Sequence, residues 1–152
     1  MPVNSNIQLR FCPASEVDIP TVFSMAKELV DTYEDVAAID YCKVIRWMER
    51  KITDCIHSYT CVYAGDEKAA YFSLSMESGQ GELDDLYVLP QFRGQGIGDA
   101  IVKHCIAQTD VPLYLYVFKG NAAAIKLYSC NGFRVAEDVS KTRMIMRREV
   151  DR

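Results

Sequence analysis

The sequence predicts an α/β fold, built as one domain over residues 1–152. Strand-like and helix-like segments follow one another in the order β-α-α-β-β-β-α-β-α-β-β. No internal repeat, low-complexity stretch or linker divides the chain. Its 152 residues, of which 49% are hydrophobic and 25% charged, are enough to bury one core without disulfide or metal support.

The first two elements are a short strand and a helix. Residues 7–11 alternate apolar and polar side chains, which is typical of a strand. We expect Asp18 to be the N-cap of the helix, with Pro20 in its first turn, where a missing N–H costs little. An apolar stripe at helical spacing then runs as far as Tyr33.

A second helix is predicted after an acidic break over residues 32–40. Asp40 is the expected N-cap, and apolar residues recur at helical spacing as far as Cys55. Trp47 lies on this helix and is interpreted as a packing residue.

The rest of the chain alternates between strands and two further helices. Turn signals rich in glycine and aspartate separate the strands. The predicted strands are residues 59–64, 69–76, 82–89, 113–118, 133–139 and 142–148, and the predicted helices are 96–108 and 121–130.

A glycine-rich loop joins the strand that ends near residue 89 to the next helix. Gly94, Gly96 and Gly98 stand at alternate positions, and residues without a Cβ tolerate the positive φ that lets successive N–H groups point one way. Such N–H groups, in front of a helix N-terminus, form a site suited to a pyrophosphate. The loop ends in Gly98-Asp99-Ala100, without the lysine and hydroxyl of a P-loop. Its G-x-G-x-G spacing also differs from the G-x-G-x-x-G of a dinucleotide-binding fold.

Two motifs make the chain resemble one family. Arg93, Gly96 and Gly98 fall on the fixed positions of the R/Q-x-x-G-x-G/A signature of the GCN5-related N-acetyltransferases, the GNAT superfamily. The run Leu-Tyr-Val-Leu-Pro-Gln-Phe over residues 86–92 is typical of that family's fourth strand and its exit. A second family block, with asparagine first and tyrosine last, matches residues 121–128.

The resemblance implies a GNAT-type fold and acetyl-coenzyme A as the donor. We therefore expect a mixed, mostly antiparallel sheet of six to seven strands, splayed between strands 4 and 5 and flanked by about four helices. The pyrophosphate would lie on the glycine loop, and the pantetheine arm would run beside the fourth strand and satisfy its unpaired backbone groups. The residues expected to bind the cofactor are Leu86, Tyr87, Val88, Arg93, Gly94, Gln95, Gly96, Ile97, Gly98, Asn121 and Tyr128.

The resemblance also suggests which residues carry the chemistry. Tyr128 occupies the position of a tyrosine that protonates the departing coenzyme A sulfur, and this role is favoured over packing on the sheet, which is the alternative. The backbone N–H of Val88 is the expected oxyanion donor. Glu82 is the candidate base, with Asp84 and Asp85 close enough along the strand to raise one carboxyl pKa; a solvated strand start is the alternative.

The acceptor is predicted to be a primary amine of a small molecule or a peptide. Tyr33 and Glu34 lie where the family builds its acceptor wall, and Phe118 could line the same pocket. A solvated helix end and a core phenylalanine are the alternatives. A catalytically inactive acyl-coenzyme A sensor is the competing function, and a thiol-based redox role is a third.

Composition limits partners and compartment. The net charge of −4 argues against sequence-independent nucleic-acid binding. Six cysteines without a CxxC pair, and two histidines apart from them, predict no metal site. Residues 1–5 lack the features of a signal peptide, and no run approaches membrane-spanning length, so the cytoplasm is the expected location. Relatives often dimerise through strand and helix edges, so a homodimer is allowed.

Overall fold

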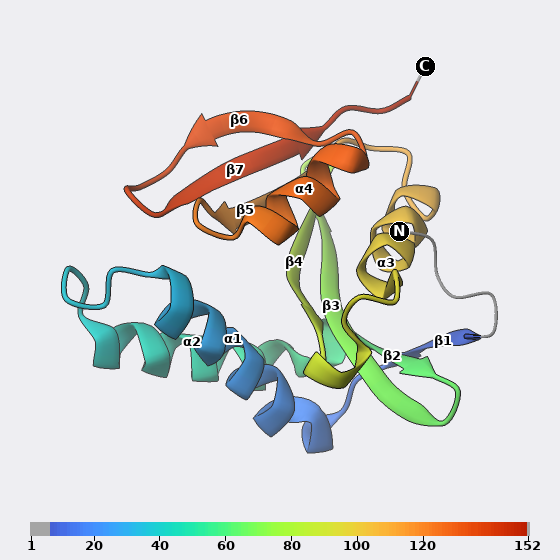
Figure 1. Ribbon diagram of the computed structural model, residues 1–152, viewed down its shortest axis with the longest axis horizontal. Coiled ribbons are helices and arrows are strands. Elements are labelled where there is room, and N and C mark those ends of the chain that lie inside the picture. The colour runs from blue at the N-terminus through green and yellow to red at the C-terminus, as the bar shows by residue number, and fades with distance from the viewer. Residues whose placement is uncertain (1–6, 152) are drawn as a thin grey trace.

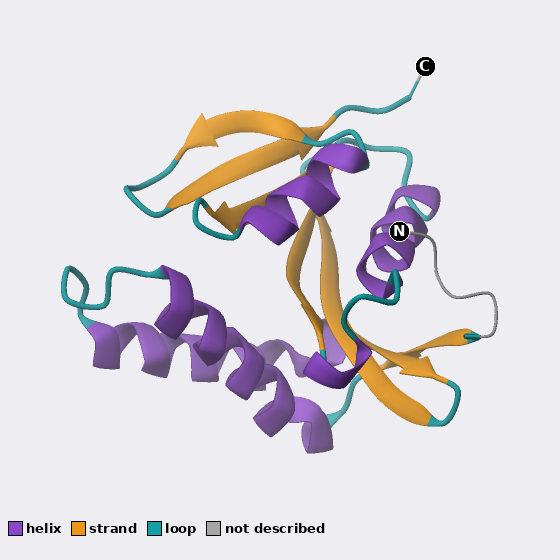
Figure 2. Ribbon diagram, in the orientation of Figure 1, coloured by secondary structure: helices purple, strands orange, loops and turns teal. Residues whose placement is uncertain are grey.

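The computed structural model describes residues 7–151, and its elements follow the predicted order (Figures 1 and 2). Residues 1–6 lie outside this range, and with them the whole segment 1–5 from which no signal peptide is predicted. None of the helices within 7–151 is long and apolar enough to cross a membrane. The strands are β1 (Leu9–Pro13), β2 (Tyr59–Ala64), β3 (Glu67–Glu77), β4 (Gln80–Val88), β5 (Leu113–Phe118), β6 (Arg134–Asp138) and β7 (Arg143–Arg148). The helices are α1 (Ile19–Tyr33), α2 (Tyr41–Cys55), α3 (Ile97–Ala107) and α4 (Ala122–Cys130).

All seven strands form one sheet in the order β1-β2-β3-β4-β5-β7-β6. Every neighbouring pair is antiparallel except β4 and β5, which run parallel. Their pairing is confined to Gly81 with Leu113 and Glu82 with Tyr114. Beyond these residues the strands diverge, and Figure 1 shows β5, β6 and β7 turned away from β1 to β4. The predicted splay between strands 4 and 5 is confirmed.

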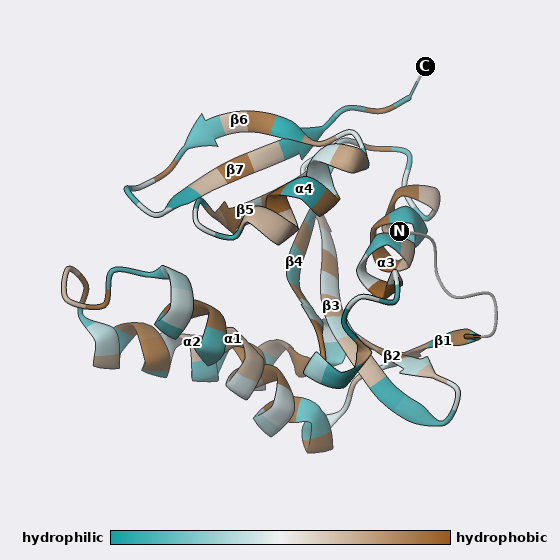
Figure 3. Cartoon of the chain, viewed as in Figure 1, coloured by the Kyte–Doolittle hydropathy of each residue, from teal (hydrophilic) through white to brown (hydrophobic). Residues whose placement is uncertain are grey.

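The helices cover the sheet in pairs and bury two apolar clusters. Buried residues of α1 and α2 pack with Tyr59, Tyr71 and Tyr87 of the sheet, and those of α3 and α4 pack with Leu83 and Leu115. Along α1 and α2 polar and apolar residues alternate in patches, as expected of helices with one buried face (Figure 3). The gap where β4 and β5 diverge therefore has α1 and α2 on one side and α3 and α4 on the other.

A bulge in β4 lies next to the point of divergence. The register between β3 and β4 shifts between the pairs Tyr71–Tyr87 and Ser73–Asp84, so two β4 residues oppose one β3 residue. Asp85 adopts the left-handed φ of 52°, which is unusual for a residue with a side chain. Because a bulge bends its strand and increases the local twist, it turns β4 away from β5.

All three predicted N-cap residues stand at the N-cap positions of their helices, and two of them cap with their side chains. The Asp40 carboxylate accepts a bond from the backbone N–H of Lys43, and the Asn121 side chain accepts one from Ala124, both at 3.2 Å. Asp18 also stands at the predicted N-cap position of α1, but its side chain forms no capping bond. This residue ends a short 3-10 turn, Glu16–Asp18, and its buried carboxylate instead accepts bonds from Lys68, Tyr71 and the Ser15 backbone.

Four sequence predictions need correction. The first strand begins two residues later than predicted, and the strand predicted over residues 69–76 extends from Glu67 to Glu77. Cys55 ends α2 on its exposed side and does not belong to the buried stripe. Trp47 is 62% exposed, so it is not a packing residue of the core.

Candidate active site

A cleft of about 990 Å³ opens where β4 and β5 diverge. Its walls come from α1 and α2 on one side and from the glycine loop, α3 and α4 on the other. Most of the predicted site residues line it. These are Tyr33, Glu82, Leu86, Tyr87, Val88, Arg93, Gly94, Gly96, Ile97, Gly98, Phe118, Asn121 and Tyr128.

The glycine loop has the predicted conformation at two of its three glycines. Gly94 and Gly96 have φ values of 78° and 81°, and Gly96 is the N-cap of α3. The first N–H groups of α3 have no partners within the helix, and they lie at the end of the loop that borders the cleft. Gly98 has no positive φ; a Cβ there would lie 3.3 Å from Leu127 Cδ2. The third glycine therefore allows α3 and α4 to approach each other.

Arg93 and Gln95 behave differently from the glycines. The Arg93 Nε donates to the Val88 carbonyl oxygen at 3.0 Å, which ties the loop to the end of β4. The Gln95 Nε2 lies 3.4 Å from the Gln91 carbonyl oxygen, and Gln95 is not among the residues that line the cleft. The side chain of Gln95 thus contacts the loop itself on the side away from the cleft.

Tyr128 presents its side chain to the cleft from α4. Its ring is buried against Phe133, with centroids 5.7 Å apart. Burial, and then the negative charge of Asp84, raises the pKa of Tyr128 above its ordinary value. The phenol is therefore protonated at neutral pH and can donate a proton or a hydrogen bond.

Three carboxylates extend along β4 at the floor of the cleft. Glu82 lies 3.4 Å from the Tyr114 hydroxyl. Asp85 accepts a hydrogen bond from the Tyr59 hydroxyl and another, 2.6 Å long, from the Tyr87 hydroxyl. Burial, and then the neighbouring Asp85 charge, raises the pKa of Asp84 to about 6. The sequence anticipated one raised pKa in this group.

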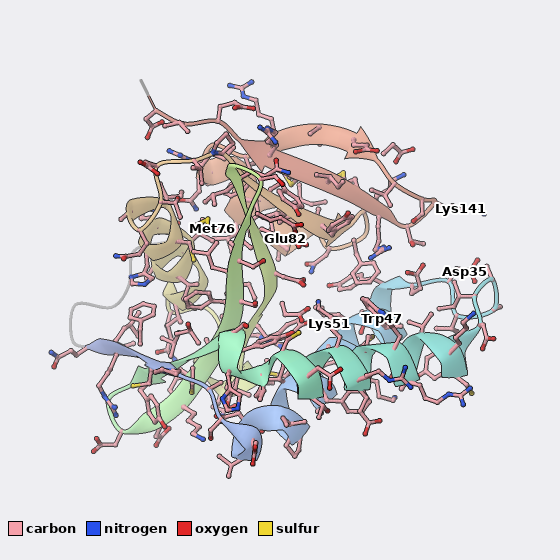
Figure 4. All side chains as sticks on the ribbon, turned by 180° about the vertical axis from the view of Figure 1, so that it is seen from behind. Asp35, Trp47, Lys51, Met76, Glu82 and Lys141 are labelled. Carbon is pink, nitrogen blue, oxygen red and sulfur yellow. The ribbon has the colours of Figure 1, made fainter. Side chains whose placement is uncertain are left out.

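Lys51 of α2 is a cleft residue that the sequence did not single out. Its ammonium pairs with Asp84 and lies 3.5 Å from Asp85. Burial opposes the charge of Lys51, but the two carboxylates outweigh it and raise its pKa. Lys51 stands four residues after Trp47, so both side chains lie on the same face of α2. Figure 4 shows both side chains on the side of α2 turned toward β4, where Glu82 lies.

The predicted acceptor residues are brought together only in part. Tyr33 stacks on Phe118, with centroids 5.9 Å apart and planes inclined by 26°, and both line the cleft. Glu34 is not among the lining residues; its carboxylate accepts a hydrogen bond from the Thr142 hydroxyl. The side chain of Glu34 therefore ties the end of α1 to the loop between β6 and β7.

Comparison with known families identifies this architecture. A family model described as the acetyltransferase (GNAT) family matches residues 23–133, which include the glycine loop, the splayed strands and α4. The chain belongs to the GNAT family. A search among curated proteins found no match. The expected single GNAT-type domain, with a mixed and open sheet flanked by helices, is confirmed.

Solved structures share this GNAT fold at low sequence identity. A PaiA N-acetyltransferase from Thermoplasma acidophilum, solved in complex with coenzyme A, superposes with a TM-score of 0.69 at 21% identity, covering 93% of this chain and 99% of that one. An acetyltransferase from Thermus thermophilus gives 0.70 at 20%, covering 99% and 100%. The ribosomal-protein-S18-alanine N-acetyltransferase from Escherichia coli gives 0.67 at 20%, covering 95% and 96%. At such identities these similarities establish the fold.

Proposed function

We propose that this GNAT protein is an N-acetyltransferase that moves an acetyl group from acetyl-coenzyme A to a primary amine. The observation that carries the proposal is the single cleft that joins a left-handed glycine loop, the open edge of β4 and the protonated hydroxyl of Tyr128. The coenzyme A held by the Thermoplasma relative supports the same donor here.

The donor half of the cleft fits acetyl-coenzyme A. The N-terminal N–H groups of α3, next to Gly94 and Gly96, would receive the pyrophosphate. Beyond Glu82, β4 has no β5 partner, so its backbone groups near Leu86 and Val88 can pair with the pantetheine amides. The cofactor would supply the activated acetyl group as a thioester.

The chemistry requires three functions from the protein. A carboxylate takes a proton from the incoming ammonium, the Val88 N–H stabilises the oxyanion, and Tyr128 protonates the departing sulfur. Glu82 is the base that the sequence proposes, and Asp84 is a second carboxylate in the same cleft. The acceptor would enter along the wall formed by α1 and α2 and contact Tyr33 and Phe118.

Calorimetric titration and a transfer screen test the proposal. We expect acetyl-coenzyme A and desulfo-coenzyme A to bind, and we expect acetylation of at least one acceptor among polyamines, aminoglycosides, amino acids and peptide N-termini. No detectable binding of either cofactor would overturn the proposal. Binding without transfer or hydrolysis across the panel would instead support the alternative of an inactive acyl-coenzyme A sensor.

Compartment and assembly belong to the same proposal. All six cysteines are free, which supports a reducing compartment such as the cytoplasm. A homodimer is proposed only because members of the family often dimerise. Sedimentation of the purified chain would measure its assembly state directly.

A further inference from the structure

The carboxylates of β4 do not have equal freedom to act. Both oxygens of Asp85 accept hydrogen bonds, one from Tyr59 and one from Tyr87, so this side chain holds the bulge to β2 and to its own strand. One oxygen of Asp84 pairs with Lys51, and its other oxygen has no hydrogen-bond partner within residues 7–151. Asp84 therefore combines an anchored position with a free oxygen at the cleft.

Asp84 lies in the same cleft as the groups that are expected to react. Asp84 and Tyr128 both line the cleft, and the charge of Asp84 acts on the Tyr128 hydroxyl strongly enough to contribute to its raised pKa. Glu82 lies two residues earlier, where β4 is still paired with β5, whereas Asp84 lies beyond that pairing, directly before the bulge. Asp84 thus lies nearer along β4 to the backbone N–H of Val88 expected to stabilise the oxyanion.

We infer that Asp84 is the carboxylate that takes the acceptor's proton, and that Lys51 is a positioning residue that orients Asp84 and sets its affinity for that proton. This inference rests on the proposed acetyl transfer and assigns two of its residues. The proton moves from the acceptor ammonium to the free oxygen of Asp84, and the nitrogen lone pair attacks the thioester carbonyl carbon. The nitrogen, now bonded to the acyl carbon, gives up a second proton to solvent, the C–S bond breaks, and the sulfur takes a proton from Tyr128. Asp84 then returns its proton to solvent, and Tyr128 is reprotonated from solvent.

The groups around Asp84 explain why Lys51 alone can set the pKa of this carboxyl. Burial and the charge of Asp85 favour the protonated acid, whereas Lys51 favours the carboxylate. With a pKa of about 6, Asp84 is ionised at neutral pH and still basic enough to accept a proton. The titratable groups facing Asp84 come from four elements. They are Lys51 of α2, Tyr59 of β2, Glu82, Asp85 and Tyr87 of β4, and Tyr128 of α4.

Lys51→Met tests the role of the lysine. Without the cation, Asp84 should hold its proton to higher pH, because a nearby opposite charge shifts a carboxyl pKa by about one unit or more. The acid limb of kcat/KM, measured with the best acceptor from the screen, should move upward by at least about one pH unit. The ¹³C-detected NMR titration of the Asp84 carboxyl carbon should move with it, and this measurement needs no acceptor.

Matched variants separate this role from a structural one. Lys51→Arg keeps the cation and should restore an acid limb close to that of the wild type. Lys43→Met, on an exposed lysine of the same helix outside the cleft, should leave both pH profiles unchanged. Asp84→Asn should lower kcat about a hundredfold or more and remove the acid limb.

Three results would overturn the inference. One is an Asp84 titration in Lys51→Met that matches the wild type. Another is an acid limb that survives in Asp84→Asn but disappears in Glu82→Gln, which would make Glu82 the base. The third is a wild-type protein that transfers acetyl groups but whose acid limb of kcat/KM no Lys51 variant shifts; this result would overturn the present inference alone. If no transfer is detected at all, the proposed function is overturned together with the inference. Should Lys51→Met not fold, Lys51→Gln carries the same test.

Discussion

Tyr128 has a buried ring, and its hydroxyl forms no hydrogen bond with any residue in the range 7–151. Tyr128→Phe removes only that hydroxyl and keeps the ring packing against Phe133. We expect kcat for acetyl transfer to fall about a hundredfold, because the departing sulfur loses its proton donor. The dissociation constant of acetyl-coenzyme A, measured by calorimetry, should change little.

Tyr63→Phe is the matched control for this variant. Tyr63 lies on β2, outside the cleft, where its ring contacts Arg10. Removing its hydroxyl should leave both kcat and cofactor affinity unchanged. Equal losses of turnover and binding in Tyr128→Phe would show that the tyrosine is structural.

Gly96 combines a positive φ with a position at the N-terminus of α3. Gly96→Asp strains the backbone and places a negative charge where the pyrophosphate is expected. We expect the dissociation constant of acetyl-coenzyme A to rise by about tenfold or more, since tenfold corresponds to about 1.4 kcal/mol.

Gly65→Asp separates charge at the site from backbone strain. Gly65 also has a positive φ, 64°, but it lies in the turn between β2 and β3, where an added Cβ meets no atom within 4 Å. This control should cost stability and leave the dissociation constant unchanged. An unaltered dissociation constant in Gly96→Asp would contradict the assignment of the loop.

Single residues also show where prediction from sequence reaches its limit. The positive φ of Gly94 and Gly96 was predicted from their spacing, whereas the role of Gly98 depends on the distant Leu127 and was not. Lys51 could not be assigned, because its partners lie more than 30 residues away and come close to it only through folding. Glu34 was expected at the acceptor, but its partner Thr142 is on a distant hairpin.

At the scale of elements, Asp18 joins the turn before α1 to strand β3. Burial alone would raise the pKa of Asp18, but hydrogen bonds from Lys68, Ser15 and Tyr71 lower it below the usual value. A carboxylate with a lowered pKa stabilises the fold above its unfolded value of about 4, and this contribution is lost as pH falls through the folded value.

Asp18→Asn should therefore lower the free energy of unfolding by about 2 kcal/mol at pH 7. The difference from the wild type should shrink below about pH 4. Urea unfolding at pH 7 and pH 3 measures both values. Asp66→Asn, in the exposed turn between β2 and β3, is the control and should change little at either pH. Equal stability of Asp18→Asn and wild type at pH 7 would contradict this role.

Most elements could be predicted because their patterns are local. The caps Asp40 and Asn121 use bonds three residues away, within reach of sequence reasoning. Asp18 stands at its predicted N-cap position but makes no side-chain cap, because distant partners, Lys68 and Tyr71, take up its carboxylate. The bulge at Asp85 was missed for the same reason, because one of the two tyrosines that hold it, Tyr59, lies on β2.

At the scale of the whole molecule, the cleft divides the sheet, and the cofactor is proposed to bridge it. Coenzyme A at a hundred times its dissociation constant should stabilise the fold by about 2.7 kcal/mol. For a chain of this size, the melting temperature should rise by roughly 5–10 °C in differential scanning fluorimetry. The rise should be smaller for Gly96→Asp at the same concentration. A melting temperature that does not respond to coenzyme A would contradict the proposed site.

The divergence of β4 from β5 also matters for solubility. Past Glu82, neither strand pairs with the other, so each presents hydrogen-bonding groups along an inner edge of the sheet. Such edges can recruit any extended segment, including one from another copy of the chain. Coenzyme A would then compete with self-association for the same groups. Protein stored without the cofactor is expected to aggregate faster than protein stored with it, and light scattering would follow the difference.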